Sequence, residues 1–375
     1  MRCLGVVPGT HRVDVVHRPE PGLPGAHEVL MDMVECGVCG TDRHIIAGGR
    51  ARPAPSEGAL VLGHEPLGRV LAVGAAVRHL AEGDFVTATN QRSCGSCAPC
   101  AAGEVDLCLS AAGSGRGVGG MDGFLRPRLL DDGAFCVRVP PHLAGVAVLT
   151  EPLAVCEKII AQLRQVQRRL PRTPWSEQAG GADWAAGLRF LVGGAGPIGT
   201  LAAFALRCHG AEVSVLDRAP ADSVKAHLLQ RIGVRYYCSE GATGDELAER
   251  AAAAGPVDCA LEAAGSGDVC LALWRALERN GALGVLGGGH RGESLVPPDE
   301  LFGRALSSNL ALVGSVASNP RHFEMALTDL DLCLGLFPDA IAEVVSLRCD
   351  FDHADQAFDP GGADDVKRVI TLAGA

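Results

Sequence analysis

Two short segments of the chain carry the side chains that a catalytic zinc ion uses. Cys39 lies within residues 36–44, and His64 and Glu65 follow about twenty residues later. A thiolate, an imidazole and a carboxylate suit a tetrahedral Zn²⁺ that keeps one coordination position open for chemistry. The residue types therefore predict a catalytic zinc held by Cys39, His64 and Glu65.

Two further polar residues, Thr41 and His44, stand between these ligands. A hydroxyl and an imidazole can carry a proton from an alcohol to water, so we predict that Thr41 and His44 form a relay. Glu65, acting through a water, is the alternative proton carrier. An isolated histidine is usually a surface or capping residue, and that structural role is the alternative for His44.

A third segment adds a carboxylate at the start of a predicted helix. Pro152 suits the first turn of a helix that continues to about Leu170, because the missing N–H of proline costs nothing there. Glu151 then sits at the mouth of this helix and is predicted as another ligand of the catalytic zinc. The alternative is a carboxylate that only stabilises the helix dipole.

Four cysteines predict a second metal site. Cys94, Cys97 and Cys100 are spaced by three residues, and Cys108 follows eight residues later. Four thiolates from one lobe can enclose a structural zinc that has no room for a substrate. The alternatives are a redox pair or an iron–sulfur cluster.

A dinucleotide-binding motif begins near residue 189. The predicted strand 189–193 leads into a glycine-rich turn and a helix, which is the order needed to bind a pyrophosphate at a helix N-terminus. The residues of this turn that we expect at the cofactor are Gly194, Gly196, Pro197, Ile198 and Gly199.

The next predicted strand ends in Asp217, eighteen residues after Gly199. A carboxylate there accepts hydrogen bonds from the adenosine ribose and repels a 2′-phosphate, which favours NAD. Arg218 can pair with that phosphate, so NADP is the alternative. Residues 287–289, including Gly287 and Gly288, follow another predicted strand and are expected beside the nicotinamide half, with a plain turn as the alternative.

The bulk properties limit the function classes. A chain of 375 residues with 47% hydrophobic residues predicts a globular protein of two domains. The formal net charge of −11 argues against nucleic acid as a partner. No apolar run approaches the length of a membrane span, and the N-terminus lacks an apolar signal core. We therefore expect a cytoplasmic protein that acts on a small molecule, without a membrane partner.

The order of predicted elements gives an α/β fold. Short apolar runs broken by glycine and proline predict a β-rich unit, whereas strands alternate with helices after residue 188 and predict a doubly wound parallel sheet. We assign residues 1–170 and 316–375 to the β-rich catalytic domain, with the cysteine lobe at about 92–110, and residues 188–315 to the dinucleotide-binding domain. We predict that residues 171–187 form a surface loop at the boundary between the two domains.

With these motifs, the chain resembles the zinc-containing medium-chain dehydrogenase/reductase family. Segments 37–42, 63–65, 94–108 and 194–199 carry the resemblance, while 150–153, Glu157-Lys158 and 314–316 resemble its glucose dehydrogenase branch. The resemblance implies a GroES-like catalytic domain, a Rossmann domain with the active cleft between them, and homodimers or homotetramers. It also implies that Cys39, His64 and a carboxylate hold the catalytic zinc, and that Glu65 and Glu151 alternate as ligands or one of them binds through water.

The departures from this branch concern the substrate. Its Glu-Arg-Gly segment, whose glutamate contacts sugar hydroxyls, is matched here by Gly115-Arg116-Gly117, and its Gly-Ser-Val-Asn segment ends here in Ala317. Asn90 keeps a polar group at a position that resembles one lining the sugar site. Because buried polar groups discriminate strongly between hydroxyl patterns, we expect a polyol, sugar-like, aminocyclitol or specialised-metabolite substrate rather than glucose.

Two other functions compete with alcohol oxidation. One is reduction of a conjugated C=C or iminium bond, with the zinc positioning the substrate. The other is a non-enzymatic zinc protein that binds a partner through its cysteine lobe. The hydroxyl of Thr41 and the imidazole of His44 favour an alcohol dehydrogenase, and the glycine-rich turn argues against the non-enzymatic protein.

Overall fold

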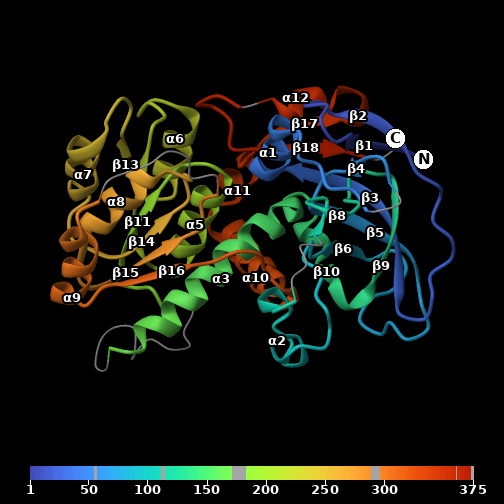
Figure 1. The fold of residues 1–375 in the computed structure, drawn as a ribbon, viewed down its shortest axis with the longest axis horizontal. Coiled ribbons are helices and arrows are strands. Elements are labelled where there is room, and N and C mark those ends of the chain that lie inside the picture. The colour runs from blue at the N-terminus through green and yellow to red at the C-terminus, as the bar shows by residue number, and fades with distance from the viewer. Residues whose placement is uncertain (55–56, 111–114, 171–182, 289–295, 360, 373–375) are drawn as a thin grey trace.

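The computed structural model describes the whole chain except residues 55–56, 111–114, 171–182, 289–295, 360 and 373–375. Gly289 and the larger part of the predicted boundary loop therefore lie outside the described residues. Figure 1 shows two halves that lie side by side, one rich in strands and one built of strands and helices.

The strand-rich half contains the candidate zinc ligands. Its largest sheet runs in the order β10-β6-β5-β3-β18-β17, and β9 pairs with β3. The strands of this sheet are β3 (Glu28–Val38), β5 (Glu65–Val73), β6 (Phe85–Ala88), β9 (Arg128–Asp132), β10 (Cys136–Val139), β17 (Val345–Asp350) and β18 (Lys367–Thr371). Val29, Met31 and Met33 alternate into the core along β3, as expected for a strand with one buried face. The strands β17 and β18, late in the chain, thus join a sheet that begins with β3.

Smaller elements complete this half. A three-stranded sheet is formed by β1 (Arg2–Val6), β2 (Asp14–His17) and β4 (Leu60–Val61), and a two-stranded one by β7 (Gly115–Arg116) and β8 (Gly120–Met121). The short helices are α1 (Gly40–Gly48), α2 (Ala98–Ala101) and α12 (Asp355–Phe358). The 3₁₀ turns of the chain are η1 (Val105–Leu107), η2 (Gly133–Phe135), η3 (Pro141–Leu143), η4 (Ala147–Leu149) and η6 (Phe351–His353).

The other half is a parallel sheet covered by helices, which confirms the predicted α/β fold. Its order, β13-β12-β11-β14-β15-β16, is that of dinucleotide-binding sheets, in which the ligand site lies where the order reverses beside β11. The strands are β11 (Arg189–Gly193), β12 (Glu212–Asp217), β13 (Arg235–Cys238), β14 (Val257–Glu262), β15 (Leu277–Val285) and β16 (Ala311–Gly314). The helices are α5 (Pro197–Cys208), α6 (Val224–Arg231), α7 (Gly244–Ala252), α8 (Gly267–Ala276), α9 (Arg304–Ser308) and the π-helical turn η5 (Asp299–Gly303).

Two long helices connect the halves. In Figure 1, α3 (Thr150–Gln167) runs from the strand-rich half to the parallel sheet, with α10 (Pro320–Leu336) beside it. Leu153 of α3, Phe204 of α5 and Phe323 of α10 belong to one buried cluster. The short α11 (Pro338–Glu343) then leads back to β17. This packing fixes the start of α3, which carries Glu151, against both halves.

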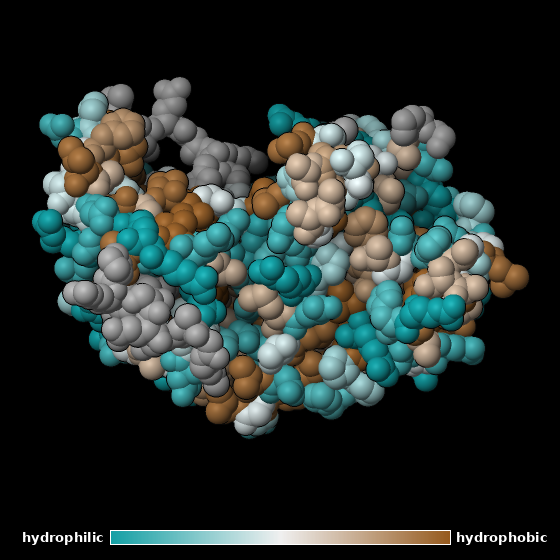
Figure 2. Space-filling view, turned by 90° about the horizontal axis from the view of Figure 1, so that it is seen from below, coloured by the Kyte–Doolittle hydropathy of each residue, from teal (hydrophilic) through white to brown (hydrophobic). Residues whose placement is uncertain are grey.

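The described surface is mixed in character. Figure 2 shows one face, on which hydrophilic residues predominate and apolar ones are interspersed. Among the helices of the described residues, none has the length and apolar content that crossing a membrane requires.

Candidate active site

The structure brings Cys39, His64 and Glu65 together. One ligand atom from each lies within 4.8 Å of the others. His64 and Glu65 are buried, and Cys39 is half-buried. A sulfur, a nitrogen and an oxygen donor gathered at a buried point fit zinc, whose catalytic sites use mixed donors of this kind.

Asp42 holds the two segments that carry these ligands. Cys39 is the N-cap of α1, and its backbone N–H donates to the Asp42 carboxylate at 2.8 Å. Gly63 N–H donates to the same carboxylate at 3.4 Å, and His64 Nδ1 lies 3.4 Å from Asp42 Oδ1. Burial would raise the pKa of Asp42, but His64 and the backbone N–H of Cys39 hold it below its usual value. This role of Asp42 was not predicted from the sequence, although an acidic residue three positions after a helix N-cap is the signal of a capping box.

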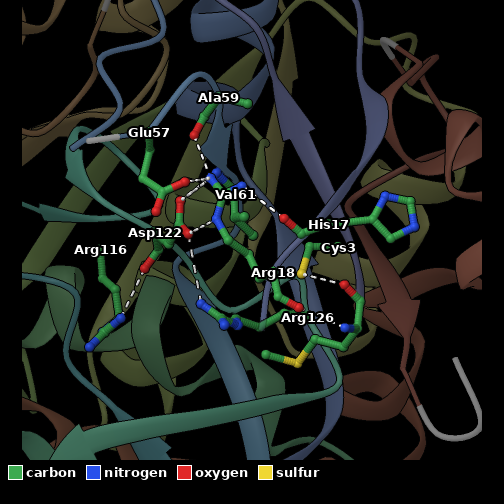
Figure 3. A network of polar contacts seen from close by, with 10 residues as sticks. Cys3, His17, Arg18, Glu57, Ala59, Val61, Arg116, Asp122 and Arg126 are labelled. Atoms are coloured by element: carbon green, nitrogen blue, oxygen red, sulfur yellow. Dashed lines mark hydrogen bonds and ion pairs between the residues drawn. The ribbon is translucent and has the colours of Figure 1, made fainter. Parts of the chain in front are cut away.

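A polar network centred on Asp122 fixes the backbone before His64 (Figure 3). Arg18 Nε donates to Asp122 at 2.6 Å, and Val61 N–H donates to the same carboxylate at 3.0 Å. Phe124 N–H, two residues further along the chain, donates to the carbonyl of Gly63 at 3.0 Å. Gly63 has φ +88°, a conformation that favours glycine. The network therefore sets the direction in which the chain enters His64.

Glu65 has a partner that the sequence did not reveal. It lies opposite Gly37 in the pairing of β5 with β3, and it forms an ion pair with Lys367 of β18. Lys367 Nζ also donates to the carbonyl of Val38 at 3.1 Å. Both Glu65 and Lys367 are 1% exposed, so the pair is shielded from water.

Glu151 lies near this group without belonging to it. It is buried at the start of α3, and within the described chain the cluster of potential ligands holds Cys39, His64 and Glu65 only. Burial and the charge of Glu65 raise the pKa of Glu151 to about 7, against the opposing effect of His64. Its role as a zinc ligand stays a prediction.

The predicted proton relay lies on α1. Thr41 Oγ1 is 3.7 Å from the sulfur of Cys39, so its hydroxyl is beside the candidate metal site. His44 lies one turn further along α1 and is exposed. The arrangement leads from the buried ligands to solvent.

The four-cysteine lobe closes on itself. The sulfurs of Cys94, Cys97, Cys100 and Cys108 lie within 4.8 Å of one another, with Cys97 Sγ 3.3 Å from Cys100 Sγ. Backbone N–H groups, foremost that of Ser96, lower the pKa of Cys94 to about 5, which favours the thiolate. Four sulfurs without a further donor fit a structural zinc.

The lobe is attached to the long helices by buried charges. Asp106 Oδ2 lies 2.6 Å from Lys158 Nζ of α3, and Asp106 Oδ1 accepts from Asn319 Nδ2 at 2.8 Å. Lys158 also donates to the carbonyl of Val316 at 2.7 Å. The lobe is thus connected to the segment that follows β16 and contains Ala317.

The residues expected around the substrate lie on separate segments. Asn90 is half-buried after β6, and its carbonyl accepts from Arg116 N–H at 2.9 Å. The Arg116 guanidinium donates twice to Asp131 at 3.1 Å. It has no acceptor atom, so it does not replace a missing carboxylate. Gly115 adds no side chain there, and Ala317 has φ +59°.

The glycine-rich turn has the geometry of a pyrophosphate site. Gly194 has φ +103°, and a Cβ on Gly199 would overlap the carbonyl of Gly194. Gly196 is the N-cap of α5 and Pro197 its first residue, so Ile198 follows in the first turn, where backbone N–H groups lack intrahelical acceptors. This turn fits the phosphates of a dinucleotide.

Asp217 lies at the end of β12 beside this turn. It accepts hydrogen bonds from the N–H groups of Ala195 and Ala219, both at 2.8 Å. Each carboxylate oxygen has a second lone pair, so these bonds position the group and leave it able to accept from a ribose. Arg218 is exposed.

The second glycine pair follows the neighbouring strand. Gly287 N–H donates to the carbonyl of Glu262 at 2.9 Å, just after β15. A Cβ on Gly265 would overlap the carbonyl of Gly288, so the segments 262–265 and 287–288 approach closely here. Gly287 and Gly288 thus lie past the carboxyl end of their strand, on the side where ligands bind such sheets.

Comparisons with known proteins agree with this geometry. The family model for the alcohol dehydrogenase GroES-like domain matches residues 25–141, and that for the glucose dehydrogenase C-terminus matches residues 144–372. A glucose 1-dehydrogenase of Methanocella arvoryzae is 34% identical, with 99% of each chain covered. One of Thermoproteus tenax is 34% identical, with 88% of each chain covered.

Solved structures share the whole fold. The glucose dehydrogenase of Haloferax mediterranei, in complex with NADP, zinc and gluconolactone, superposes with a TM-score of 0.85 at 25% identity over all of both chains. The galactitol-1-phosphate dehydrogenase of Escherichia coli gives a TM-score of 0.78 at 21% identity over 99% of both chains, which shows the fold alone.

Proposed function

Because the chain belongs to the zinc-containing medium-chain dehydrogenase/reductase family, in its glucose dehydrogenase-like branch, we propose that it oxidises a hydroxyl of a sugar-like polyol. Membership makes it an NAD(P)-dependent oxidoreductase with zinc, and excludes the non-enzymatic zinc protein. The observation that carries the proposal is the convergence of Cys39, His64 and Glu65 on one buried point.

Each residue of the site has a part in this reaction. Zinc, when bound by Cys39, His64 and a carboxylate, would polarise the hydroxyl of the substrate and lower its pKa. The nicotinamide would supply the hydride acceptor. Thr41, beside Cys39, takes the proton of the substrate hydroxyl into its hydrogen bond, and the cofactor ribose would pass it to His44 and solvent. The alternative is that Glu65 carries the proton through a water.

The proposed preference for NAD over NADP depends on Asp217 at the end of β12. A carboxylate that receives two backbone N–H groups, as Asp217 does, is fixed beside the turn and carries a full negative charge towards any 2′-phosphate. We therefore propose NAD as the preferred cofactor. The NADP complex of the Haloferax relative makes NADP the alternative, with Arg218 as its phosphate partner.

The substrate proposal rests on two side chains that this chain lacks. Gly115 and Ala317 stand where the glucose dehydrogenase branch has a glutamate and an asparagine. The neighbouring Arg116 is hydrogen-bonded to Asp131. A site that loses hydrogen-bonding groups loses preference for the hydroxyls they bind. The curated relatives named above are glucose 1-dehydrogenases, so glucose is the reference substrate against which a different polyol must be preferred.

Restoring one of these groups tests the proposal. Ala317 has φ +59°, a left-handed conformation that asparagine tolerates better than alanine. Ala317→Asn should therefore fold well and raise kcat/KM for glucose relative to an aminocyclitol or a less polar alcohol. Ala317→Gly is the matched control, because it relieves the backbone without adding an amide.

The assay is NADH and NADPH production across sugars, amino sugars, cyclitols and simple alcohols. Wild-type activity that is highest on glucose, unchanged in Ala317→Asn, would contradict the substrate proposal and leave the alcohol dehydrogenase class intact. Absence of alcohol oxidation together with reduction of enals would contradict the class and favour a C=C reductase.

We also propose that the chain forms homo-oligomers. β16 is an edge strand of the parallel sheet, and Leu306, Leu312 and Val316 around it are 87%, 54% and 77% exposed. An exposed edge with apolar side chains is a template for pairing with a second copy. Leu312→Lys should reduce the mass measured by light scattering, and an unchanged mass would exclude this edge as the interface.

A further inference from the structure

The ion pair of Glu65 and Lys367 occupies a place between three strands. β18 pairs with β3, which in turn pairs with β5, so Lys367 and Glu65 reach towards each other across β3. Lys367 Nζ also bonds to the carbonyl of Val38, the residue directly before Cys39. The ammonium therefore touches the carboxylate of one candidate zinc ligand and the backbone directly before another.

Gly37 makes room for this pair. A Cβ on Gly37 would overlap the Glu65 carboxylate and lie 2.8 Å from Lys367 Cε. The backbone of Gly37 does not adopt a positive φ, so no turn requires glycine at this position. The requirement is space for the carboxylate and the ammonium above β3.

The ligands predicted for the catalytic zinc number one more than such a zinc needs. Cys39, His64, Glu65 and Glu151 would together fill a tetrahedral shell, as in closed structural sites. A catalytic zinc keeps three protein ligands and one exchangeable position. One carboxylate must therefore be withheld, and Glu65 is the one already neutralised by a buried cation.

We propose that Lys367 is a positioning residue that competes with zinc for Glu65 and so keeps one coordination position of the catalytic zinc open. The inference rests on the proposed function, because it concerns the metal bound by Cys39 and His64. Inside the protein a carboxylate without a cation is strongly disfavoured, so removing Lys367, the cation paired with Glu65, favours binding of Glu65 to the metal.

This role predicts two changes in opposite directions. In Lys367→Met, Glu65 becomes a permanent ligand, so zinc should bind at least about tenfold more tightly while turnover falls. A lysine that only supported the fold would lower zinc affinity and turnover together when it is removed. Glu65→Gln in the Lys367→Met background should return zinc affinity to the wild-type level.

The test uses the full chain loaded with zinc or cobalt(II). Chelator competition measures the affinity for the zinc at Cys39 and His64. Added azide binds an exchangeable coordination position, which the visible spectrum of the cobalt form reports. We expect azide to shift the wild-type spectrum and to leave that of Lys367→Met unchanged, while Lys367→Arg restores the shift. Weaker zinc binding in Lys367→Met together with a retained azide shift would overturn the inference.

A second variant covers the case in which Lys367→Met fails to fold. Gly37→Ala keeps both charges and forces the pair apart, so it should also tighten zinc binding and abolish the azide shift. Zinc affinity and azide response as in the wild type would overturn the inference. A wild-type chain that holds metal in the four-cysteine lobe alone would instead overturn the proposed function, and the inference with it.

Discussion

Replacing Lys158 by methionine should loosen the four-cysteine lobe by about 3–5 kcal/mol, the cost of leaving one member of a buried ion pair without its partner. The Lys158 and Asp106 side chains are 3% and 1% exposed, and their charged atoms lie 2.6 Å apart. Burial would raise the pKa of Asp106, but Lys158 holds it below its usual value, so the carboxylate is charged at neutral pH. The variant therefore buries a carboxylate with no cation.

Hydrogen exchange measures this loosening where it occurs. A change of about 3–5 kcal/mol in a local opening equilibrium corresponds to exchange faster by a factor on the order of 10²–10⁴. We expect this acceleration in peptides that cover 98–108 and 315–323, because Lys158 also bonds to the carbonyl of Val316. Peptides that cover β14 should keep their wild-type rates.

A double variant separates charge from packing. Lys158→Met combined with Asp106→Asn removes both charges and keeps an acceptor for Asn319, so most of the protection should return. Wild-type exchange in the single variant would refute the reasoning, because the pair would then contribute nothing. Equal acceleration in the single and double variants would refute it too, because the loss would come from packing.

Three further predictions concern other buried or positioned carboxylates. Asp42→Asn should lower the affinity for zinc at Cys39 and His64 by about 10–100-fold in chelator competition, because Asp42 orients both ligands. Unchanged affinity would contradict this. Burial and the neighbouring charge of Asp329 raise the pKa of Glu157 well above 4.5. The wild type should thus lose about 1.4 kcal/mol per pH unit as pH rises from 4.5 towards that raised pKa. The melting temperature of Glu157→Gln should exceed that of the wild type by a margin that grows with pH, and parallel curves would count against the shift. Asp217→Ala should weaken NAD binding more than NADP binding in titration calorimetry, and equal losses would exclude its ribose role.

Local motifs predicted most of the candidate site. Cys94 to Cys108 span one short lobe, and the glycine-rich turn sits between a strand and a helix that are readable from apolar periodicity. The residue types also indicated Cys39 and His64, because few other roles need a cysteine, a histidine and a carboxylate in such proximity. The α/β fold follows from the same local order of elements.

The features of the site that the sequence did not predict depend on contacts between distant segments. Lys367 meets Glu65 only because the last strand of the chain, β18, inserts beside β3. Sequence spacing contains no signal for that insertion, since the two residues are separated by almost the whole chain. Gly37 is a second example, because its φ is not positive and the glycine is needed only for the space that Glu65 and Lys367 occupy beside it.

The direct test of the central claim is anomalous diffraction at the zinc absorption edge from crystals of the wild-type protein. We predict two peaks for each chain, one among the sulfurs of the lobe at 94–108 and one bounded by Cys39, His64 and a carboxylate. A single peak in the lobe, with none between Cys39 and His64, would contradict the account.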